Sequence, residues 1–246
     1  MRLITVLILL LIVAGCYRRA PLVAEEPVQV IRSDKAPYFS YGLTVPADVY
    51  LDTVLFEDTA LSLTCSVLLP LHKNERWQQA DLLLKQQIEK GKQEFISSVR
   101  ERLKKYPDSK YNVLGNVYTV EPEQIYVDSM IISYCLEIMY QHAGAVHPMM
   151  MYYSFNYDKQ KKRQIGFTDY FDIKTKQDSL WLIGGIGRRV LSAEYLDKVY
   201  DYDFNVTDTT VSFNFDDYEI ASYANGVARA VFEKDSVRRY IRPDYK

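Results

Sequence analysis

The sequence has little of several features that would identify a function on their own. Its formal net charge is only −2, which gives no bulk electrostatic reason to bind nucleic acid, so we expect no nucleic-acid partner. It contains no internal repeat and no low-complexity segment. Its N-terminal apolar run, residues 3–15, ends after thirteen residues, whereas a membrane-spanning helix needs about twenty. The run is therefore too short to be a permanent membrane anchor.

Sequence motifs of catalysis are also missing. There is no Gly-x-Ser-x-Gly nucleophile elbow, and the glycine-rich run 184–189 lacks both the phosphate-loop pattern and the strand that opens it. No pair of acidic residues stands out by its surroundings, and neither Cys65 nor Cys135 has an evident histidine base. We therefore expect no enzyme activity and no cofactor.

The first sixteen residues are the most informative part of what is present. Arg2 precedes the apolar run, which is the layout of a secretory signal peptide. The run closes with Val-Ala-Gly before Cys16 and so resembles the bacterial lipobox, in which small residues admit the peptidase and the thiol takes a diacylglyceryl group. We predict a signal peptide over residues 1–15 and lipid attachment at Cys16. The alternative is an ordinary signal peptide with a chance cysteine.

Lipid on Cys16 would hold the mature protein on a membrane. Each buried CH₂ group of an acyl chain contributes ~0.8 kcal/mol, so the two or more chains of a lipoprotein bind firmly. No acidic residue follows Cys16 directly, and sorting rules then favour the outer membrane, with the protein facing the periplasm. Residues 16–37 contain prolines and few aromatic residues, which predicts a tether.

The remaining chain predicts an α+β fold with antiparallel sheet packed against one long and one shorter helix. We expect an N-terminal domain over residues 38–122, with strands and a long helix at 74–106, and a C-terminal domain over residues 123–246. Asn74 is the expected cap of the long helix, whose apolar stripe is Trp77, Leu84, Ile88, Phe95, Val99 and Leu103. The charges on its other face fit a solvated surface better than a partner-binding or membrane-binding one.

Alternating and β-branched stretches predict the strands, and polar caps predict the other helices. Pro70 should end the first confident strand, and Thr168 should cap a single helical turn. Asp178 or Ser179 should cap the shorter helix, which would run to about Glu194. Its inward residues should be Leu180, Ile183, Val190 and Leu191, with glycines that let it lie close on the sheet. The predicted strands are 61–69, 113–120, 124–141 (or a bent pair), 149–157, 165–167, 210–215 and 228–232, and a terminal helix is expected near 236–241.

The two cysteines of the mature chain are expected to be free and buried. Cys65 lies on the apolar face of its strand, whereas Cys135 points away from the apolar face of its own strand. A disulfide needs Cα atoms about 5.5 Å apart and converging side chains, so strand phase argues against a bridge even though the compartment permits one.

Two stretches could carry function. His142 and His147 flank a short loop and could share a metal, but no third ligand stands out, so backbone hydrogen bonds that shape the turn are the simpler role. The loop 216–226 places three acids and two tyrosines between strands, where acids can steer a basic partner and tyrosines can anchor it. The structural alternative is a crossover in which the tyrosines plug the core. The candidate binding residues are Asp216, Asp217, Tyr218, Glu219 and Tyr223.

Four segments of the C-terminal half resemble the RsiV-like domain, the extracytoplasmic domain of the lysozyme-sensing anti-sigma-V factor. They are His142 to His147, Tyr152 to Asp158, Ile165 to Phe171 and Phe213 to Gly226. The strand and long helix before them resemble its companion domain, which is also attached to some peptidoglycan deacetylases. The resemblance implies a recognition module without catalysis, for lysozyme-like proteins or wall material. Because only fifteen residues precede Cys16, we expect no anti-sigma activity.

The main hypothesis is thus a non-enzymatic binding lipoprotein of the envelope that holds a basic protein or peptidoglycan. Two alternatives stay open: a cell-wall enzyme or accessory subunit that uses the loop between His142 and His147, and a structural envelope protein.

Overall fold

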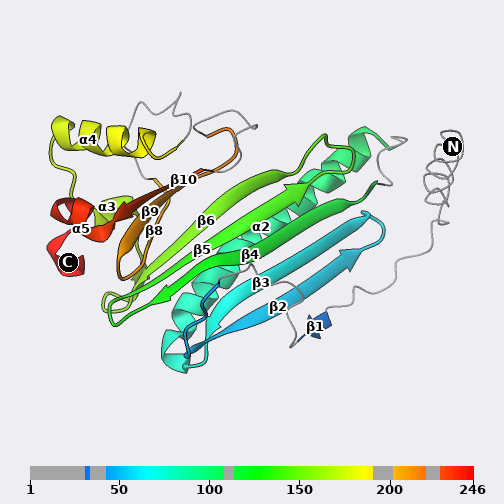
Figure 1. Ribbon diagram of the computed structural model, residues 1–246. Coiled ribbons are helices and arrows are strands. Elements are labelled where there is room, and N and C mark those ends of the chain that lie inside the picture. The colour runs from blue at the N-terminus through cyan, green and yellow to red at the C-terminus, as the bar shows by residue number, and fades with distance from the viewer. Residues whose placement is uncertain (1–30, 34–42, 108–113, 191–201, 220–227) are drawn as a thin grey trace, which may run out of the picture.

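A computed structural model describes residues 31–33, 43–107, 114–190, 202–219 and 228–246 (Figure 1). Seven strands form the main sheet in chain order: β1 (Ile31–Ser33), β2 (Val49–Asp58), β3 (Leu63–His72), β4 (Asn116–Val127), β5 (Ile131–Gln141), β6 (Met149–Asp158) and β7 (Arg163–Gln164). A small sheet has the order β10 (Ala228–Glu233), β9 (Thr210–Phe215) and β8 (Phe204–Val206). The helices are η1 (Glu75–Trp77), α2 (Gln78–Lys105), α3 (Phe167–Tyr170), α4 (Lys176–Gly187), α5 (Lys234–Val237), η4 (Arg238–Tyr240) and η5 (Pro243–Tyr245).

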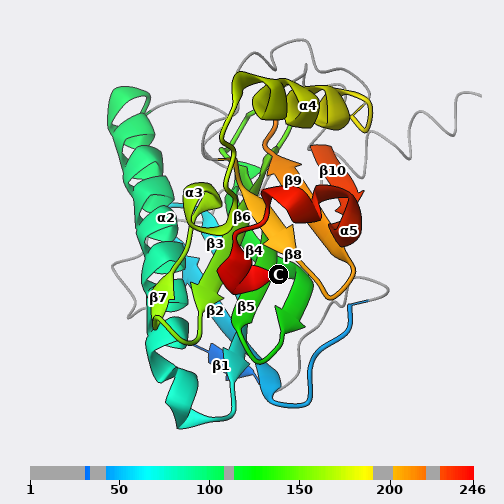
Figure 2. The ribbon, with the colours of Figure 1, turned by 90° about the vertical axis from the view of Figure 1, so that its left-hand side faces the viewer.

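The molecule has three layers. Helix α2 lies across one face of the main sheet, and the small sheet with the shorter helices lies against the other face (Figures 1 and 2). Strand β8 contacts β5 and β6, which places the small sheet over that end of the main sheet. The predicted α+β class, with one long and one shorter helix on antiparallel sheet, is confirmed.

One pairing of the main sheet departs from the antiparallel pattern. Strands β3 and β4 pair in parallel from Leu63 with Asn116 to Val67 with Val120, because α2 connects them as a crossover. The prediction that Pro70 ends its strand is wrong, since β3 continues to His72. Pro70 pairs with Leu51 on the β2 side, but the pairing of β3 with β4 ends at Val67, so the missing N–H of Pro70 breaks no ladder on that side.

Helix α2 forms where its apolar stripe predicts. The Asn74 side chain accepts a hydrogen bond from the backbone N–H of Arg76, so the predicted cap is confirmed, although the first turn is η1. The buried residues of α2 follow helical spacing: Ala80, Leu84, Ile88, Phe95, Ile96 and Val99. They join the first hydrophobic cluster, which α2 forms with β3 to β6.

Strand β5 separates two hydrophobic clusters by alternating its side chains. Ile132, Tyr134, Leu136 and Ile138 belong to the cluster under α2, whereas Ile131 belongs to the cluster under the small sheet. Cys135 is buried on the second face, and Cys65 is buried in the cluster under α2. Both thiols are free, as strand phase predicted.

The shorter helix α4 differs from its prediction at both ends and on its buried face. Thr175, rather than Asp178 or Ser179, is the cap, and its side chain accepts a hydrogen bond from the Asp178 backbone. The predicted inward residue Leu180 is 51% exposed, whereas Leu182 and Ile186 are buried. The face with Leu182 and Ile186 is buried because it brings Gly185 against Phe232 of β10. A Cβ atom on Gly185 would lie 2.9 Å from that ring.

The predicted helix end at Glu194, with Leu191, lies outside the described residues. The cap of α3 lies two residues earlier than predicted: it is Gly166 instead of Thr168, and the Asp169 carboxylate holds the first turn by accepting from the Gly166 N–H. Strand β8 was not predicted, because three residues are too few for a period.

The residues predicted as one strand or a bent pair at 124–141 form a bent pair. They are the end of β4, a turn, and β5, joined where the Asp128 carboxylate accepts hydrogen bonds from the Met130 and Ile131 backbone. The expected domain boundary at residues 122 and 123 lies within β4, beside a register shift between Pro122 and Gln124. The division into two domains stays a prediction.

Among the residues that the structure describes, no helix is long and apolar enough to cross a membrane. Cys16, the signal peptide and most of the tether lie outside the described residues, so these features stay predictions.

Candidate functional site

The start of the predicted binding loop is fastened to the main sheet. After β9 the chain passes the beginning of β6, where the Asp216 carboxylate accepts a hydrogen bond from the Tyr152 N–H at 2.7 Å. The Asp217 carboxylate accepts from the Met150 N–H at 2.7 Å, and the Asp217 N–H donates to the Met150 carbonyl at 3.1 Å. These two acids replace a strand partner for β6, so their first role is to fix the backbone of the loop.

Tyr218 is presented outward by this fixed backbone. Its φ is +67°, a left-handed conformation that costs a non-glycine residue of order 1 kcal/mol, and its side chain is 52% exposed. Its hydroxyl lies 3.4 Å from His147 Nε2. The Glu219 carboxylate accepts from the Asp216 N–H at 2.9 Å and closes the turn. The alternative in which Tyr218 plugs the core is therefore wrong, while Tyr223 lies outside the described residues.

Burial changes the acidity of Asp216. Its surroundings raise the pKa of the carboxyl to about 6, mainly because burial disfavours the charge and further because Glu219 and Asp217 lie near it, against the hydrogen bond from Tyr152. Asp216 is thus poised to change charge just below neutral pH. Asp217 is 7% exposed, and its second oxygen has no hydrogen-bond partner among the described residues.

A second group of acids, not predicted from the sequence, lies beside the loop. Glu121 on β4 faces Glu137 on β5, and Glu137 in turn faces Tyr152 on β6, whose N–H binds Asp216. Burial raises the pKa of Glu137, and the neighbouring Glu123 and Glu121 raise it further. Like charges directly opposite each other destabilise a sheet, so this pairing has a cost that a bound cation would relieve.

One cation already lies among these acids. The Arg229 guanidinium on β10 donates to Glu123 at 2.5 Å and stacks over the Tyr152 ring at 4.7 Å. It also contacts the Cys135 sulfur at 3.2 Å, while burial raises the pKa of this thiol to about 12, which leaves it protonated and unreactive. We call the surface formed by Glu121, Glu123, Glu137, Asp216, Tyr218 and Glu219 the acidic rim.

The histidines do not form a common site. His147 Nδ1 lies 3.0 Å from the Pro148 carbonyl, and the His142 ring packs on Phe95 under α2, with centroids 4.8 Å apart. His72 is buried between Asp81 at 2.8 Å and the Tyr134 hydroxyl at 3.1 Å, where it fastens the start of α2 to the sheet. In the part of the chain that the structure describes, no three His, Cys, Asp or Glu side chains are grouped to hold a metal.

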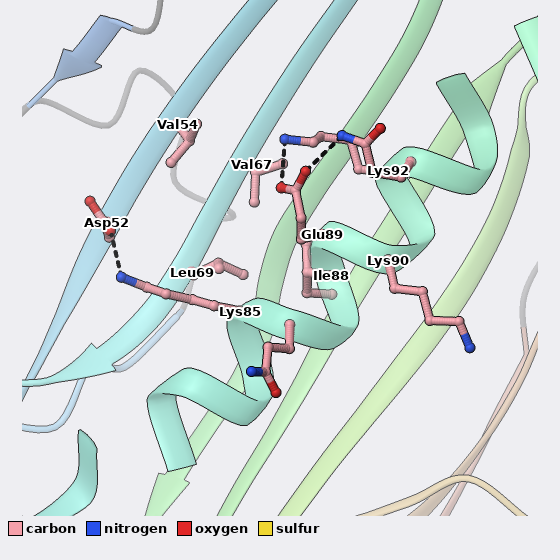
Figure 3. A pocket seen from close by; sticks show the side chains of 11 residues that line it. Asp52, Val54, Val67, Leu69, Lys85, Ile88, Glu89, Lys90 and Lys92 are labelled. Atoms are coloured by element: carbon pink, nitrogen blue, oxygen red, sulfur yellow. Dashed lines mark hydrogen bonds and ion pairs between the residues drawn. The ribbon is translucent and has the colours of Figure 1, made fainter. Parts of the chain in front are cut away.

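A groove of about 530 Å³ runs along one side of α2, between the helix and strands β2 and β3 (Figure 3). Val54, Val67 and Leu69 line its floor. One ion pair crosses it from α2 to β2, Lys85 with Asp52 at 3.4 Å, and a second lies along the helix wall, Lys92 with Glu89 at 2.6 Å. Because these charges already neutralise each other, the groove offers little to a polar ligand.

Comparison with known proteins places the fold. A scan against protein-family models finds no match for the sequence, and a search of curated proteins finds none either. Two solved structures of DUF3298 family proteins superpose over most of the chain. The Bacteroides fragilis protein has a TM-score of 0.51 and 11% identity, covering 89% of this chain and 94% of its own. The Pseudomonas aeruginosa protein has a TM-score of 0.52 and 13% identity, covering 90% and 97%.

The fold is that of DUF3298 proteins. DUF3298 is the family of RsiV-like domains, so the likeness of fold agrees with the sequence resemblance. At this identity it establishes the DUF3298 fold and carries no ligand with it. On this fold the acidic rim combines residues of β4 and β5 in the main sheet with the loop that follows β9 in the small sheet.

Proposed function

We propose that the protein is a non-catalytic binding protein of the bacterial envelope that holds a basic, lysozyme-like protein on the acidic rim. One observation carries the proposal: Tyr218 is exposed on a strained backbone that three carboxylates fasten in place. Strain of this kind persists where the surroundings over-determine it and is concentrated at binding sites. A rigid exposed tyrosine is also a typical interface anchor.

The charges around Tyr218 favour a basic partner. Glu121, Glu123 and Glu137 lie on neighbouring strands, where Arg229 pairs with Glu123, and the loop adds Asp216 and Glu219. Burial and, after it, repulsion from Glu123 and Glu121 raise the pKa of Glu137, and a cationic side chain from a partner would relieve that repulsion. Such complementarity speeds association and selects the partner by charge.

The proposed setting is the cell envelope. Cleavage before Cys16 and acylation of its thiol would attach the protein to a membrane, and the absence of an acidic residue just after it favours the outer membrane. A basic extracellular protein that enters the envelope would meet the rim there.

Binding of lysozyme to the immobilised full chain tests the proposal. We expect Tyr218→Ala and Asp216→Ala to weaken binding at least about tenfold, since an anchor residue contributes about 2 kcal/mol or more. Tyr50→Ala is the matched control, because Tyr50 is 42% exposed but lies on β2, away from the rim. Affinity should fall as salt is raised. Absence of wild-type binding, or equal losses in all three variants, would refute the proposal.

A further inference from the structure

A second groove runs along the other side of α2 and is independent of the acidic rim. It has a volume of about 490 Å³, within the range of about 300–1,000 Å³ typical of small-molecule sites. Strands β4, β5 and β6 form its floor, and Gly91 opens its helix wall. The Tyr118 hydroxyl lies 3.2 Å from where a Cβ atom of Gly91 would be, so any larger residue would begin to fill the groove.

The walls of this groove are largely aromatic. Phe95 is central, with Tyr118 and Tyr140 each at 5.6 Å and His142 at 4.8 Å between ring centroids. Tyr153 and Met151 continue the lining along β6. Aromatic rings carry a negative face, which attracts the polarised C–H groups of a flat, hydroxylated ring.

Polar atoms in the groove lack partners, in contrast to those of the groove in Figure 3. Tyr118 is 3% exposed, and within the described residues its hydroxyl has no hydrogen-bond partner. His142 Nδ1 is buried and likewise without a partner in the described chain, and its Nε2 reaches Ser98 Oγ only at 3.4 Å. A buried polar atom without a partner, such as His142 Nδ1, is costly, and in the part of the chain described the Tyr118 hydroxyl has its hydrogen-bonding capacity free for a ligand or water.

The groove carries no unbalanced charge. On its rim Lys90 and Glu94 lie 3.9 Å apart, and no other charged side chain lines it. Burial and the nearby Arg102 lower the pKa of His142, so its imidazole is neutral at physiological pH. One ring nitrogen can then donate a hydrogen bond and the other can accept one. A charged ligand would therefore find no counter-ion there.

We propose that this groove binds a neutral saccharide. Its aromatic walls would pack on the apolar face of a sugar ring, and the Tyr118 hydroxyl and the His142 imidazole would hydrogen-bond the sugar hydroxyls. The groove is lined by α2 from Gln87 to Ser98, a length that suits a stretch of a longer glycan. An aromatic ligand would leave both polar atoms unpaired, and a phosphorylated one would bring charge without a partner.

Calorimetric titration of the full chain with tri-N-acetylchitotriose and with maltotriose tests the proposal. We expect saturable binding of at least one probe. Gly91→Leu should weaken it more than about tenfold by filling the groove, while improving helix propensity. Tyr118→Phe should weaken it about fivefold through loss of one hydrogen bond of about 1 kcal/mol. The matched control Gln86→Leu places the same side chain in the groove of Figure 3 and should not affect binding.

Two results would overturn the saccharide site. One is absence of heat with either probe at saturating concentration, and the other is binding that both Gly91→Leu and Tyr118→Phe leave at wild-type strength. Because Tyr218→Ala should not alter saccharide binding and Tyr118→Phe should not alter lysozyme binding, failure of this site is distinguishable from failure of the acidic rim.

Discussion

Two exposed residues, Tyr218 and Lys162, share a left-handed backbone with φ of +67° and +52°. Glycine adopts this conformation without steric cost. We therefore expect Tyr218→Gly and Lys162→Gly to keep or raise stability, by up to about 1 kcal/mol, in urea unfolding. Only Tyr218→Gly should lose lysozyme binding.

This pair of variants separates backbone strain from recognition. If Lys162→Gly also lost binding, the loss would reflect a general loosening of turns. If Tyr218→Gly retained binding, the tyrosine side chain would not be the anchor, and the acidic rim would have to act through charge alone.

Asp216 makes a prediction about pH. Its folded pKa of about 6 lies above the usual value near 3.8, so between these values the folded state binds more protons than the unfolded state. Stability from this group is complete below about pH 4 and is lost as pH rises through about 6. Asp216→Asn can still accept from Tyr152 but does not ionise, so it should gain roughly 1–2 kcal/mol over wild type at pH 7.5, allowing for partial exposure.

Urea unfolding of wild type and Asp216→Asn at pH 4, 6 and 7.5 measures this effect. The difference between the two proteins should be smallest at pH 4 and grow toward pH 7.5. A difference that is the same at all three values would show that the carboxyl has an ordinary pKa in the folded protein.

At the scale of elements, sequence periodicity decided what could be predicted. Helix α2 is long enough for its stripe to fix both its existence and its buried face, and β5 showed its two faces by alternation. Helix α4 is apolar on several sides, so its sequence allows more than one buried face, and only the contact of Gly185 with Phe232 selects one. Local sequence patterns do not predict such contacts between distant segments.

The candidate site is likewise predictable from the sequence only where its residues are consecutive. The loop from Asp216 to Glu219 could be selected because its acids and tyrosine are consecutive. The opposed pair Glu121 and Glu137 could not, since it depends on the register between β4 and β5, which includes a shift beside Pro122. The unpaired hydroxyl of Tyr118 depends on where α2 crosses the sheet, and the sequence does not give that position.

Helix α4 offers a matched pair of glycine substitutions. A Cβ atom on Gly185 would lie 2.9 Å from Phe232 Cε1, a rigid ring in the core, whereas one on Gly184 would meet only the flexible end of Arg188 at 3.3 Å. Each substitution by alanine improves helix propensity by about 1 kcal/mol. Overpacking should outweigh that gain in Gly185→Ala, which we expect to lose about 1–2 kcal/mol, while Gly184→Ala should be neutral or stabilising.

Chemical unfolding of the two glycine variants measures the difference. Equal stabilities would mean that α4 stands farther from β10 than the contact with Phe232 requires. A loss confined to Gly185→Ala would establish that this glycine sets the distance between helix and sheet.

At the scale of the whole molecule, buried polar side chains join the two hydrophobic clusters. The Asn205 amide of β8 donates to the Tyr134 carbonyl at 2.7 Å and to Ser133 Oγ at 3.2 Å. Its carbonyl oxygen accepts from Ser154 at 2.9 Å and from Asn214 at 2.7 Å. A fully satisfied polar network fixes one relative position of the sheets, whereas an apolar contact would tolerate sliding.

The network predicts that the two clusters unfold together, and the chain holds one tryptophan in contact with each. Trp77 packs against the cluster under α2, and Trp181 packs against the cluster under the small sheet.

Trp77→Phe leaves Trp181 as the reporter, and Trp181→Phe leaves Trp77. The two variants should give the same urea midpoint after correction for the stability that each substitution itself changes. Asn205→Ala should lower both midpoints together and reduce the free energy of unfolding by about 2–4 kcal/mol, since it leaves several buried groups unpaired. Ser97→Ala, at an exposed position on α2, should change stability by less than about 0.5 kcal/mol. Midpoints that separate in Asn205→Ala would show that this network couples two clusters able to unfold separately. Midpoints that separate in the wild-type background would show that the network does not couple them.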